Sequence, residues 1–446
     1  MQANVVGEEK RRRLGLIPAS AIVVSSMIGT GIFTTTGIMI EMGAGGGDIL
    51  LGWLLGGVIA FCGALCYGEI GAGLPDSGGE YHYLSRLLHP ALGFVSGCVS
   101  LVAGFAAPIA AAAMAMHLYL GKVIPNWPAR TMAIATILIL SLLHAYDLRL
   151  GSRVQTGLMS VKLLLLLAFI AGIWLRKPQA GVTVDFSFSL GLSPSFAVVL
   201  VLVSFAYSGW NAAAYVGAEI RRPERILPSS LLIGTGVVTL LYLLVNLAYL
   251  SAVPLSRLAG VEQVAQVMGE QLWGRIGGEL VALLIALAMI ASVSAMIILG
   301  PRVGEAMAKD GLLPAQFAGL NRRQVPSFAV WFQGALASLF VLTASFGPLL
   351  IYIGVTLNIF AVLTALSLFR LRRNGLSRSR ICIGYPVTPL VFSAFSLWMI
   401  VWSVRFQPLA ALASLATIIL LYAAYVVTGT IRGASKLSCR KLTNNE

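Results

Sequence analysis

The stretch Ser25-Ser26-Met27-Ile28-Gly29-Thr30-Gly31-Ile32-Phe33 places Gly-x-Gly in the middle of an apolar segment that runs from Leu16 to about Ile40. At 1.5 Å per residue this segment is about 37 Å long, more than the roughly 30 Å of bilayer hydrocarbon, so it can cross a membrane. Each glycine disfavours a helix by about 1 kcal/mol relative to alanine. We therefore expect the crossing helix to break here.

A break at this depth has a consequence for its surroundings. Unwound backbone inside a membrane is tolerated where it is buried in protein or lines a polar cavity. The helix that restarts after Gly31 would point free amide groups and its positive dipole end at such a cavity, which suits a carboxylate. Taken alone, the stretch also fits a notch for close helix packing.

The composition is that of an integral membrane protein. Of the 446 residues, 58% are hydrophobic and 11% are charged, whereas soluble domains carry about 25% charged residues. The segment 10–13 is basic and precedes the first apolar segment without a cleavage site, which favours a retained first helix. The five cysteines show no pattern typical of a metal site, and we expect neither a metal nor a cofactor.

Twelve apolar segments are long enough to cross the bilayer. They lie near 16–40, 48–74, 91–119, 129–147, 154–175, 195–218, 229–252, 277–300, 327–345, 348–369, 386–404 and 409–428. With the N-terminus inside, 23 of the 31 Lys and Arg residues fall on the inner side. This asymmetry predicts that both termini are cytoplasmic, and it explains the net charge of +14 without nucleic-acid binding.

The sixth apolar segment, like the first, contains glycine and polar residues near its centre. It places Ser208-Gly209-Trp210-Asn211 at the centre of an apolar run, 180 residues and five spans after Gly29. Two interrupted helices at corresponding positions indicate an inverted repeat, with the substrate site where the breaks meet. We thus expect a cytoplasmic N-terminus at 1–15, two repeats at 16–175 and 195–371, two further spans at 386–428 and a cytoplasmic tail at 429–446.

Lys162 is the one basic residue expected inside the membrane. A lysine at that depth costs about 2.5–3.5 kcal/mol to insert, so it should be paired, hydrated or deprotonated within the bundle. Two inner loops also carry patterns of interest. Glu80 is predicted to begin a short interfacial helix and to complement its dipole, and the charged segment 219–228 is either a gate closed by ion pairs or a topogenic loop.

Five motifs in chain order resemble the amino acid–polyamine–organocation superfamily. They are Met27-Ile28-Gly29-Thr30-Gly31-Ile32-Phe33, Ser77-Gly78-Gly79-Glu80-Tyr81, Phe205-Ala206-Tyr207-Ser208-Gly209-Trp210-Asn211, Pro223-Glu224-Arg225-x-x-Pro228 and Ala308-x-Asp310-Gly311-x-x-Pro314. The span-six string is most similar to the L-type amino acid transporter branch. The resemblance implies an all-α fold of twelve transmembrane helices of the leucine-transporter type, with 5+5 inverted repeats and broken helices one and six.

The resemblance also implies a binding site for an α-amino acid. The substrate carboxylate would meet backbone amides of the first break around Gly29, at Thr30 and Gly31, with side chains near Ser26. The ammonium group would meet carbonyls of both breaks, and Phe205 would cover the substrate while Asn211 bridges the second break. The carbonyls implied for the ammonium group are those of Met27, Phe205, Ala206 and Ser208.

The remaining implications concern coupling and partners. Lys162 falls where L-type members carry a lysine in place of a sodium site. The resemblance therefore implies that its ammonium group connects spans five and one and that transport does not depend on sodium. Ser208 stands where many L-type members have glycine, which leaves side-chain selectivity open. The loop 121–129 has no cysteine for a disulfide to an ancillary glycoprotein, so no such subunit is expected.

These observations predict a transporter and not an enzyme, in a bacterial inner membrane. We expect a sodium-independent secondary transporter of small or mid-sized neutral α-amino acids that works by alternating access, as an exchanger. Proton-coupled symport through a deprotonatable Lys162 is the alternative. A membrane sensor that binds amino acids without transporting them is the rival from another class.

Overall fold

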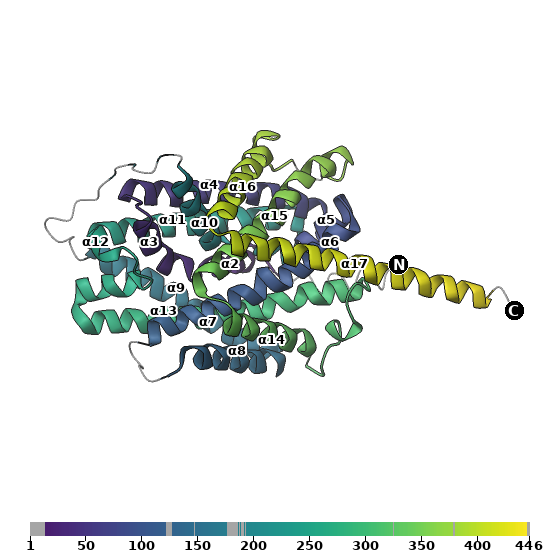
Figure 1. Cartoon of the computed structure of the whole chain (residues 1–446), viewed down its shortest axis with the longest axis horizontal. Coiled ribbons are helices and arrows are strands. Elements are labelled where there is room, and N and C mark those ends of the chain that lie inside the picture. The colour runs from purple at the N-terminus through teal and green to yellow at the C-terminus, as the bar shows by residue number, and fades with distance from the viewer. Residues whose placement is uncertain are drawn as a thin grey trace.

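The computed structural model describes residues 14–121, 127–146, 148–175, 186, 188, 191, 193–323, 325–377 and 380–443. Apart from residues 14 and 15, the expected N-terminal segment lies outside this part of the chain, as does most of the loop 121–129. The described residues form helices joined by short connections, and their one β contact is a parallel bridge between Leu14 and Ile220. The expected all-α class is confirmed (Figure 1).

The first half of the described chain contains eight α-helices, of which the first two are the two parts of one interrupted helix, and a π-helical turn. In order these are α2 (Leu16–Met27), α3 (Gly31–Glu41), α4 (Gly46–Gly73), α5 (Glu80–Leu87), α6 (Pro90–Val99), η1 (Ser100–Ala106), α7 (Ala107–Leu120), α8 (Ala129–Tyr146) and α9 (Leu148–Leu175). The short helix expected after the second span is α5. The π-helical turn η1 ends immediately before α7, whose first turn contains Pro108.

The second half begins with another interrupted helix. Its elements are α10 (Pro194–Tyr207), the 3₁₀ helix η2 (Ala212–Glu219), α11 (Pro223–Ala252), α12 (Leu255–Leu258), α13 (Val264–Lys309), η3 (Ala315–Phe317), α14 (Ser327–Thr343), α15 (Phe346–Arg373), α16 (Val387–Phe406) and α17 (Pro408–Thr443). Helix α13 is longer than the expected span 277–300. It begins at Val264, has a kink at Gly274, whose backbone angles are not helical, and continues to Lys309.

Eleven helical segments of the described chain are long and apolar enough to cross a membrane. Twelve were expected, and the difference is the segment 327–345. It forms α14, which has 17 residues and so is about 25 Å long, shorter than a typical hydrocarbon core. Helix α17 also continues past residue 428, where the tail was expected to begin, although its apolar part ends at Val427.

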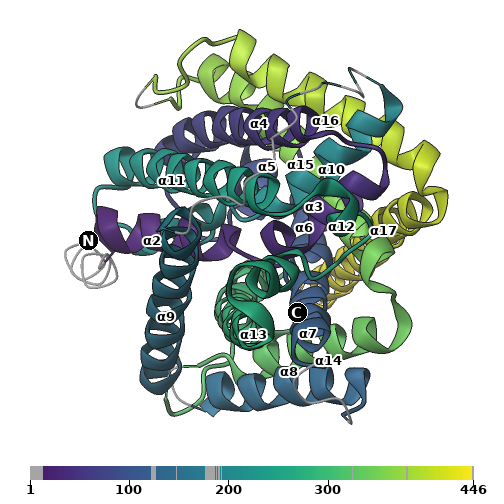
Figure 2. The same cartoon turned by 90° about the vertical axis from the view of Figure 1, so that its left-hand side faces the viewer.

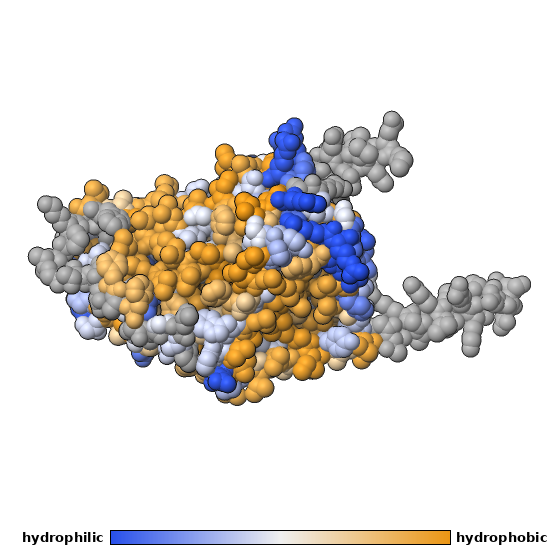
Figure 3. All heavy atoms as spheres, turned by 90° about the horizontal axis from the view of Figure 1, so that it is seen from above, coloured by the Kyte–Doolittle hydropathy of each residue, from blue (hydrophilic) through white to orange (hydrophobic). Residues whose placement is uncertain are grey.

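The helices pack as a bundle around the two interrupted ones. Viewed along the long axis, α2, α3 and α10 lie near the middle with α13, while α4 and α11 cover one side and α8 and α14 the other (Figure 2). Hydrophobic atoms cover most of the flank seen in Figure 3, and hydrophilic atoms gather at one end. The exposed side chains of the described residues include large apolar ones such as Ile139, Leu164 and Leu240, which suit contact with lipid.

One buried ion pair joins α4 to α15 near the end of both helices. Glu69 of α4 is fully buried, and the guanidinium of Arg372 in α15 donates to both of its oxygens at 2.7 and 2.8 Å. Ser377 Oγ and the backbone amide of Cys382 also donate to this carboxylate, at 2.8 and 2.9 Å. The pair therefore joins α4, α15 and the connection to α16.

We predict that Glu69→Ala destabilises the protein by about 3 kcal/mol, because removing one partner of a buried pair leaves the other charge uncompensated. The measurement is the melting temperature of purified protein in detergent. Arg373→Ala, at an exposed neighbouring position, is the control and should leave the melting temperature unchanged. Equal melting temperatures for both variants would contradict the assigned role of Glu69.

Candidate functional site

The first interruption leaves backbone carbonyls without helical partners, and side chains from three other helices meet them. Helix α2 ends at Met27 and α3 begins at Gly31. Lys162 Nζ of α9 donates to the carbonyl of Ser25 at 3.1 Å, and Ser292 Oγ of α13 donates to that of Ile28 at 3.3 Å. The interruption is thus a built feature in which freed carbonyls are satisfied.

The second interruption has the same character. Helix α10 ends at Tyr207, and the chain turns through Ser208-Gly209-Trp210-Asn211 before η2. Gly209 has a φ of 98°, in the left-handed region that favours glycine. A side chain there would also collide with the carbonyl of Ser26, whose atoms lie 2.8 Å from an added Cβ. Gly209 is therefore required both by the turn and by the neighbouring break.

The two interruptions are in direct contact. An added Cβ on Gly31 would lie 2.4 Å from the Cβ of Ala206, so α3 and α10 approach as closely as they can only because residue 31 lacks a side chain. Gly29 differs from Gly31, since its added Cβ would meet nothing closer than a backbone oxygen at 3.8 Å. The first glycine permits the bend and the second permits the contact.

A tyrosine of α11 links the two interruptions. The Tyr242 hydroxyl lies 2.6 Å from the carbonyl of Met27 and 3.1 Å from that of Ala206. Its ring packs against Trp53 and Tyr207, with centroids 5.1 and 5.2 Å away, and its side chain is fully buried. Because the hydroxyl has one proton, it can donate to one of these carbonyls at a time. The hydrogen bonding of Tyr242 therefore depends on the distance between the two breaks.

Lys162 lies on the side of the first interruption that faces α9 and α13. Besides the carbonyl of Ser25, its ammonium group donates to Ser292 Oγ at 2.9 Å, and the side chain is 1% exposed. It thus connects α9, the end of α2 and α13. It does not line the pocket described next but borders a separate small apolar cavity with Ile28 and Phe33.

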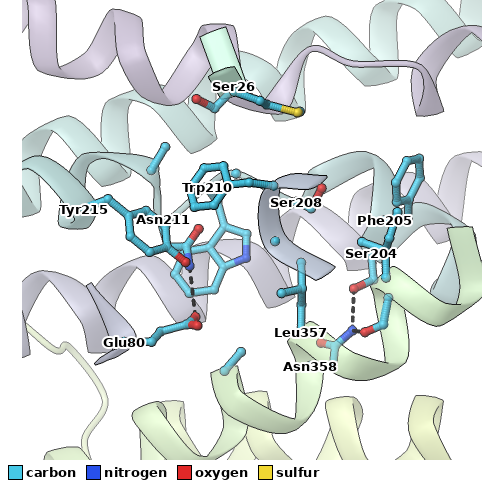
Figure 4. Close-up of a pocket in the computed structure, with 18 of the residues that line it drawn as sticks. Ser26, Glu80, Ser204, Phe205, Ser208, Trp210, Asn211, Tyr215, Leu357 and Asn358 are labelled. Carbon is cyan, nitrogen blue, oxygen red and sulfur yellow. Dashed lines mark hydrogen bonds between the residues drawn. The ribbon is translucent and has the colours of Figure 1, made fainter. Parts of the chain in front are cut away.

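A pocket lies beside the two interruptions, and we call it the central pocket (Figure 4). Its empty volume is about 810 Å³, part of which is open solvent. It is lined by residues of both interruptions, of η1 and of helices α13 and α15, together with Glu80 of α5. Its polar members are Ser26, Glu80, Ser204, Ser208, Asn211, Tyr215 and Asn358, and its apolar members include Phe105, Phe205, Trp210, Met296 and Leu357.

The structure divides the nine expected site residues into two groups. One group lines the central pocket and consists of Ser26, Phe205, Ser208 and Asn211. The other lies in the packed junction between the breaks and does not line the pocket; it consists of Met27, Gly29, Thr30, Gly31 and Ala206. The separation arises because the close contact at Gly31 and Ala206 fills the space between the amides and the cavity.

Two polar residues near the site were not predicted from the sequence, and a third, Glu80, was predicted in another role. Tyr242 stands in an apolar helix where nothing marks it, and Asn358 of α15 donates to Ser204 Oγ at 3.0 Å across the pocket. Glu80 begins α5 as expected, but it does more than complement a dipole. Its carboxylate is buried and accepts a hydrogen bond from Asn211 Nδ2 at 3.0 Å. A carboxylate and an amide in separate motifs could have been paired only by knowing the fold.

The chain just before α2 is hydrogen-bonded to the backbone at the end of η2. The Leu14 amide donates to the carbonyl of Glu219, and the Arg221 amide donates to the carbonyl of Leu14, both at 2.9 Å. The Glu219 carboxylate also forms an ion pair with Arg302 of α13. One side chain of segment 219–228, that of Glu219, thus forms an ion pair with another helix, and both interpretations of this segment stay predictions.

Comparison with known proteins identifies the family. The family model for amino acid permeases matches residues 14–433, nearly the whole chain. The chain belongs to the amino acid permease family. This confirms the resemblance to the amino acid–polyamine–organocation superfamily and its L-type branch, and with it the expectation of an amino acid transporter and not an enzyme.

Several curated relatives align with this permease over most of both chains. The serine/threonine exchanger SteT of Bacillus subtilis is 29% identical over 87% of this chain and 90% of its own length. The large neutral amino acids transporter small subunit 2 of Rattus norvegicus is 28% identical, over 89% and 77%. The human b(0,+)-type amino acid transporter 1 is 28% identical, over 86% and 82%.

We predict that Tyr242→Phe slows amino acid transport by roughly 5-fold, because one hydrogen bond of about 1 kcal/mol is lost at the junction of the breaks. Uptake into proteoliposomes measures the effect. Tyr249→Phe is the matched control, two turns further along α11, because the Tyr249 hydroxyl is buried without a partner among the described residues. If both variants transported equally fast, the junction would not depend on the Tyr242 hydroxyl.

Proposed function

We propose that this permease is a sodium-independent exchanger of small or mid-sized neutral α-amino acids that works by alternating access. The observation that carries the proposal is the junction of the two interruptions, where backbone groups of both halves of the chain meet beside a pocket. The proposal includes twelve spans, with α14 as a short one, and inverted repeats at 16–175 and 195–371. The relative from Bacillus subtilis is a serine/threonine exchanger, which supports exchange as the mode of transport.

The substrate is proposed to bind with its two charged ends at different interruptions. The α3 amides at Thr30 and Gly31, near the positive end of the helix dipole, would receive the carboxylate. The carbonyls of Met27 and Ala206 would receive the ammonium group, together with those of Phe205 and Ser208. A carbonyl oxygen has two lone pairs, so the hydrogen bond from Tyr242 leaves Met27 able to accept from a substrate as well. Binding would require the contact between Gly31 and Ala206 to loosen.

The uncharged character of the substrate side chain follows from the groups that line the central pocket. Among the described residues, Glu80 is the one lining group with a carboxylate, and it already accepts hydrogen bonds from Asn211 and Tyr67. Both bonds end on Oε1, and burial raises the pKa of Glu80 to about 7, so this group offers a cationic side chain less than a full negative charge near neutral pH. Phe205 and Ser208 border the remaining space, which favours a small side chain or one that can form a hydrogen bond.

Sodium independence is proposed from the position of Lys162. Its ammonium group donates to the carbonyl of Ser25 and the hydroxyl of Ser292, which are oxygen ligands of the type that a sodium ion would need. A fixed positive charge at these oxygens would exclude a second cation by repulsion. The same lysine carries the alternative, proton-coupled symport, since its two acceptors are neutral and would tolerate its deprotonated form.

The proposal places the protein in a bacterial inner membrane with both termini in the cytoplasm, in line with the distribution of Lys and Arg. It requires no disulfide-linked ancillary subunit. The partners of the protein are then its amino acid substrates and the lipids that surround its helices.

Counterflow in proteoliposomes tests the proposal. Vesicles loaded with unlabelled serine, threonine, leucine or arginine are mixed with the labelled amino acid in sodium or choline buffer, with and without an inward proton gradient. We expect accumulation that requires internal neutral amino acid and is equal in both salts. Uptake into empty vesicles driven by the gradient would indicate symport instead. Binding without any flux would indicate a sensor.

We predict that Lys162→Ala reduces exchange at least 10-fold, because it removes the link between α9 and the first interruption and leaves the Ser25 carbonyl without its donor. Folding should persist, as judged by a single symmetric peak in size-exclusion chromatography. The control is Leu164→Ala, at a position that is 65% exposed on the same helix. Wild-type exchange by the Lys162 variant would refute its assigned role.

A further inference from the structure

A buried carboxylate borders the central pocket without a charged partner. Glu80 is the first residue of α5, outside the membrane-spanning segments, and 3% of its surface is exposed. Figure 4 shows its side chain directed towards Asn211 and the second interruption. A carboxylate in such a position is either ionised at a considerable free-energy cost or neutral.

The hydrogen-bond partners of Glu80 are themselves neutral. Its Oε1 accepts from the Tyr67 hydroxyl of α4 at 2.6 Å and from Asn211 Nδ2 at 3.0 Å. Among the described residues no basic side chain forms an ion pair with it. Glu69, two residues from Tyr67, contrasts with it because Arg372 compensates its charge. Glu69 and Glu80 are thus buried carboxylates on neighbouring elements, and among the described residues the first pairs with a cation and the second does not.

The groups that face Glu80 from surrounding elements do not supply the missing charge. They are the phenols Tyr67 of α4, Tyr83 of α5 itself and Tyr215 of η2, and the nearby carboxylate of Asp76 acts on Tyr83. Helix α6, which packs against α5, has no Asp, Glu, Lys, Arg or His. Helix α15 also packs against α5, and its Arg372 is bound to Glu69, whereas Arg370 and Arg373 are exposed.

These surroundings change the acidity of the carboxyl group. Burial raises the pKa of Glu80 from 4.5 to about 7, and the hydrogen bonds from Tyr67 and Asn211 oppose that rise. The group can therefore hold a proton near neutral pH while it is buried. Once water reaches it, its pKa should return towards the ordinary value.

We propose that Glu80 is a proton-binding residue of the central pocket, which holds its proton while the pocket is packed as in this structure and releases it to water when the cytoplasmic side opens. The proton leaves as the carboxyl group gains solvent, and it returns when the side chain packs again against Tyr67 and Asn211. Because Asn211 belongs to the second interruption, the proton is linked to the conformation of the break.

The sign of the pH dependence follows from linkage. Between about pH 4.5 and 7 the packed conformation holds a proton that the hydrated one has lost. Raising the pH through this window disfavours the packed conformation by up to about 10-fold per pH unit, and outside the window the dependence vanishes. The packed conformation is therefore favoured at low pH.

The first test does not require transport, so it is independent of the proposed substrate. Melting temperatures of the purified protein in detergent are measured at pH 5 and pH 8 for wild type, Glu80→Gln and Glu305→Gln. The glutamine at position 80 keeps an oxygen acceptor for Tyr67 and Asn211 but cannot ionise. We expect Glu80→Gln to lose less stability than wild type between the two pH values, and the control at Glu305, which pairs with Lys309 near the end of α13, to follow wild type. Equal losses in all three proteins would overturn the proposal.

The second test uses exchange, with the same pH on both sides of the vesicle membrane. We expect the rate of wild type to change at least several-fold between pH 5 and 8, and the profile of Glu80→Gln to be flat. Tyr67→Phe removes a donor that favours the ionised form, so the inflection should move to higher pH. This second variant decides the matter if Glu80→Gln does not fold. An unchanged inflection in Tyr67→Phe would overturn the proposal, whereas absence of exchange in wild type at every pH would overturn the proposed function alone.

Discussion

The need to satisfy backbone polar groups at membrane depth shapes this permease. A continuous helix satisfies its own amides and carbonyls, but the two interrupted helices give up several of these bonds in a solvent that offers no replacement. Every element that approaches the junction supplies one. The hydroxyl of Tyr242, the ammonium of Lys162 and the hydroxyl of Ser292 come from α11, α9 and α13, and each ends on a carbonyl that the break at residues 28–30 has released.

This arrangement makes the junction both stable and movable. Each link is a single hydrogen bond of about 1 kcal/mol between a side chain and the backbone, so an interruption can exchange one partner for another at little cost. The contacts at Gly31 and Gly209, in contrast, are steric and leave no room for a side chain. The two glycines thus set how closely the two interruptions can approach, and the hydrogen bonds of the polar side chains hold the interruptions at that separation.

The buried charged side chains also divide into a fixed ion pair and groups whose contacts can change. Glu69 and Arg372 form a compensated pair that ties α4 to the end of α15, and such a pair gains nothing by moving. Glu80 and Lys162 are buried with neutral partners and contact the second and first interruptions, respectively. Uncompensated charge is costly in a low dielectric, so the protonation of Glu80 should depend on whether its surroundings are packed or hydrated.

The sequence determined much of this protein because its signals are local. Apolar length predicts the spanning helices, and the glycines and polar residues at 25–31 and 208–211 mark where two of them stop, since helix propensity and membrane insertion depend on a few neighbouring residues. It also singled out Lys162, which no apolar helix would carry without a reason. The limits appear at α14, whose 17 residues lie at the margin of a span, and at the division of the expected site between a closed junction and an open pocket. That division, the bridge made by Tyr242 and the burial of Glu80 against Asn211 were decided by tertiary structure, because they join residues up to 215 positions apart. Contacts of this kind depend on how helices pack, and the physical pattern of one segment holds no information about the partner that another segment will bring.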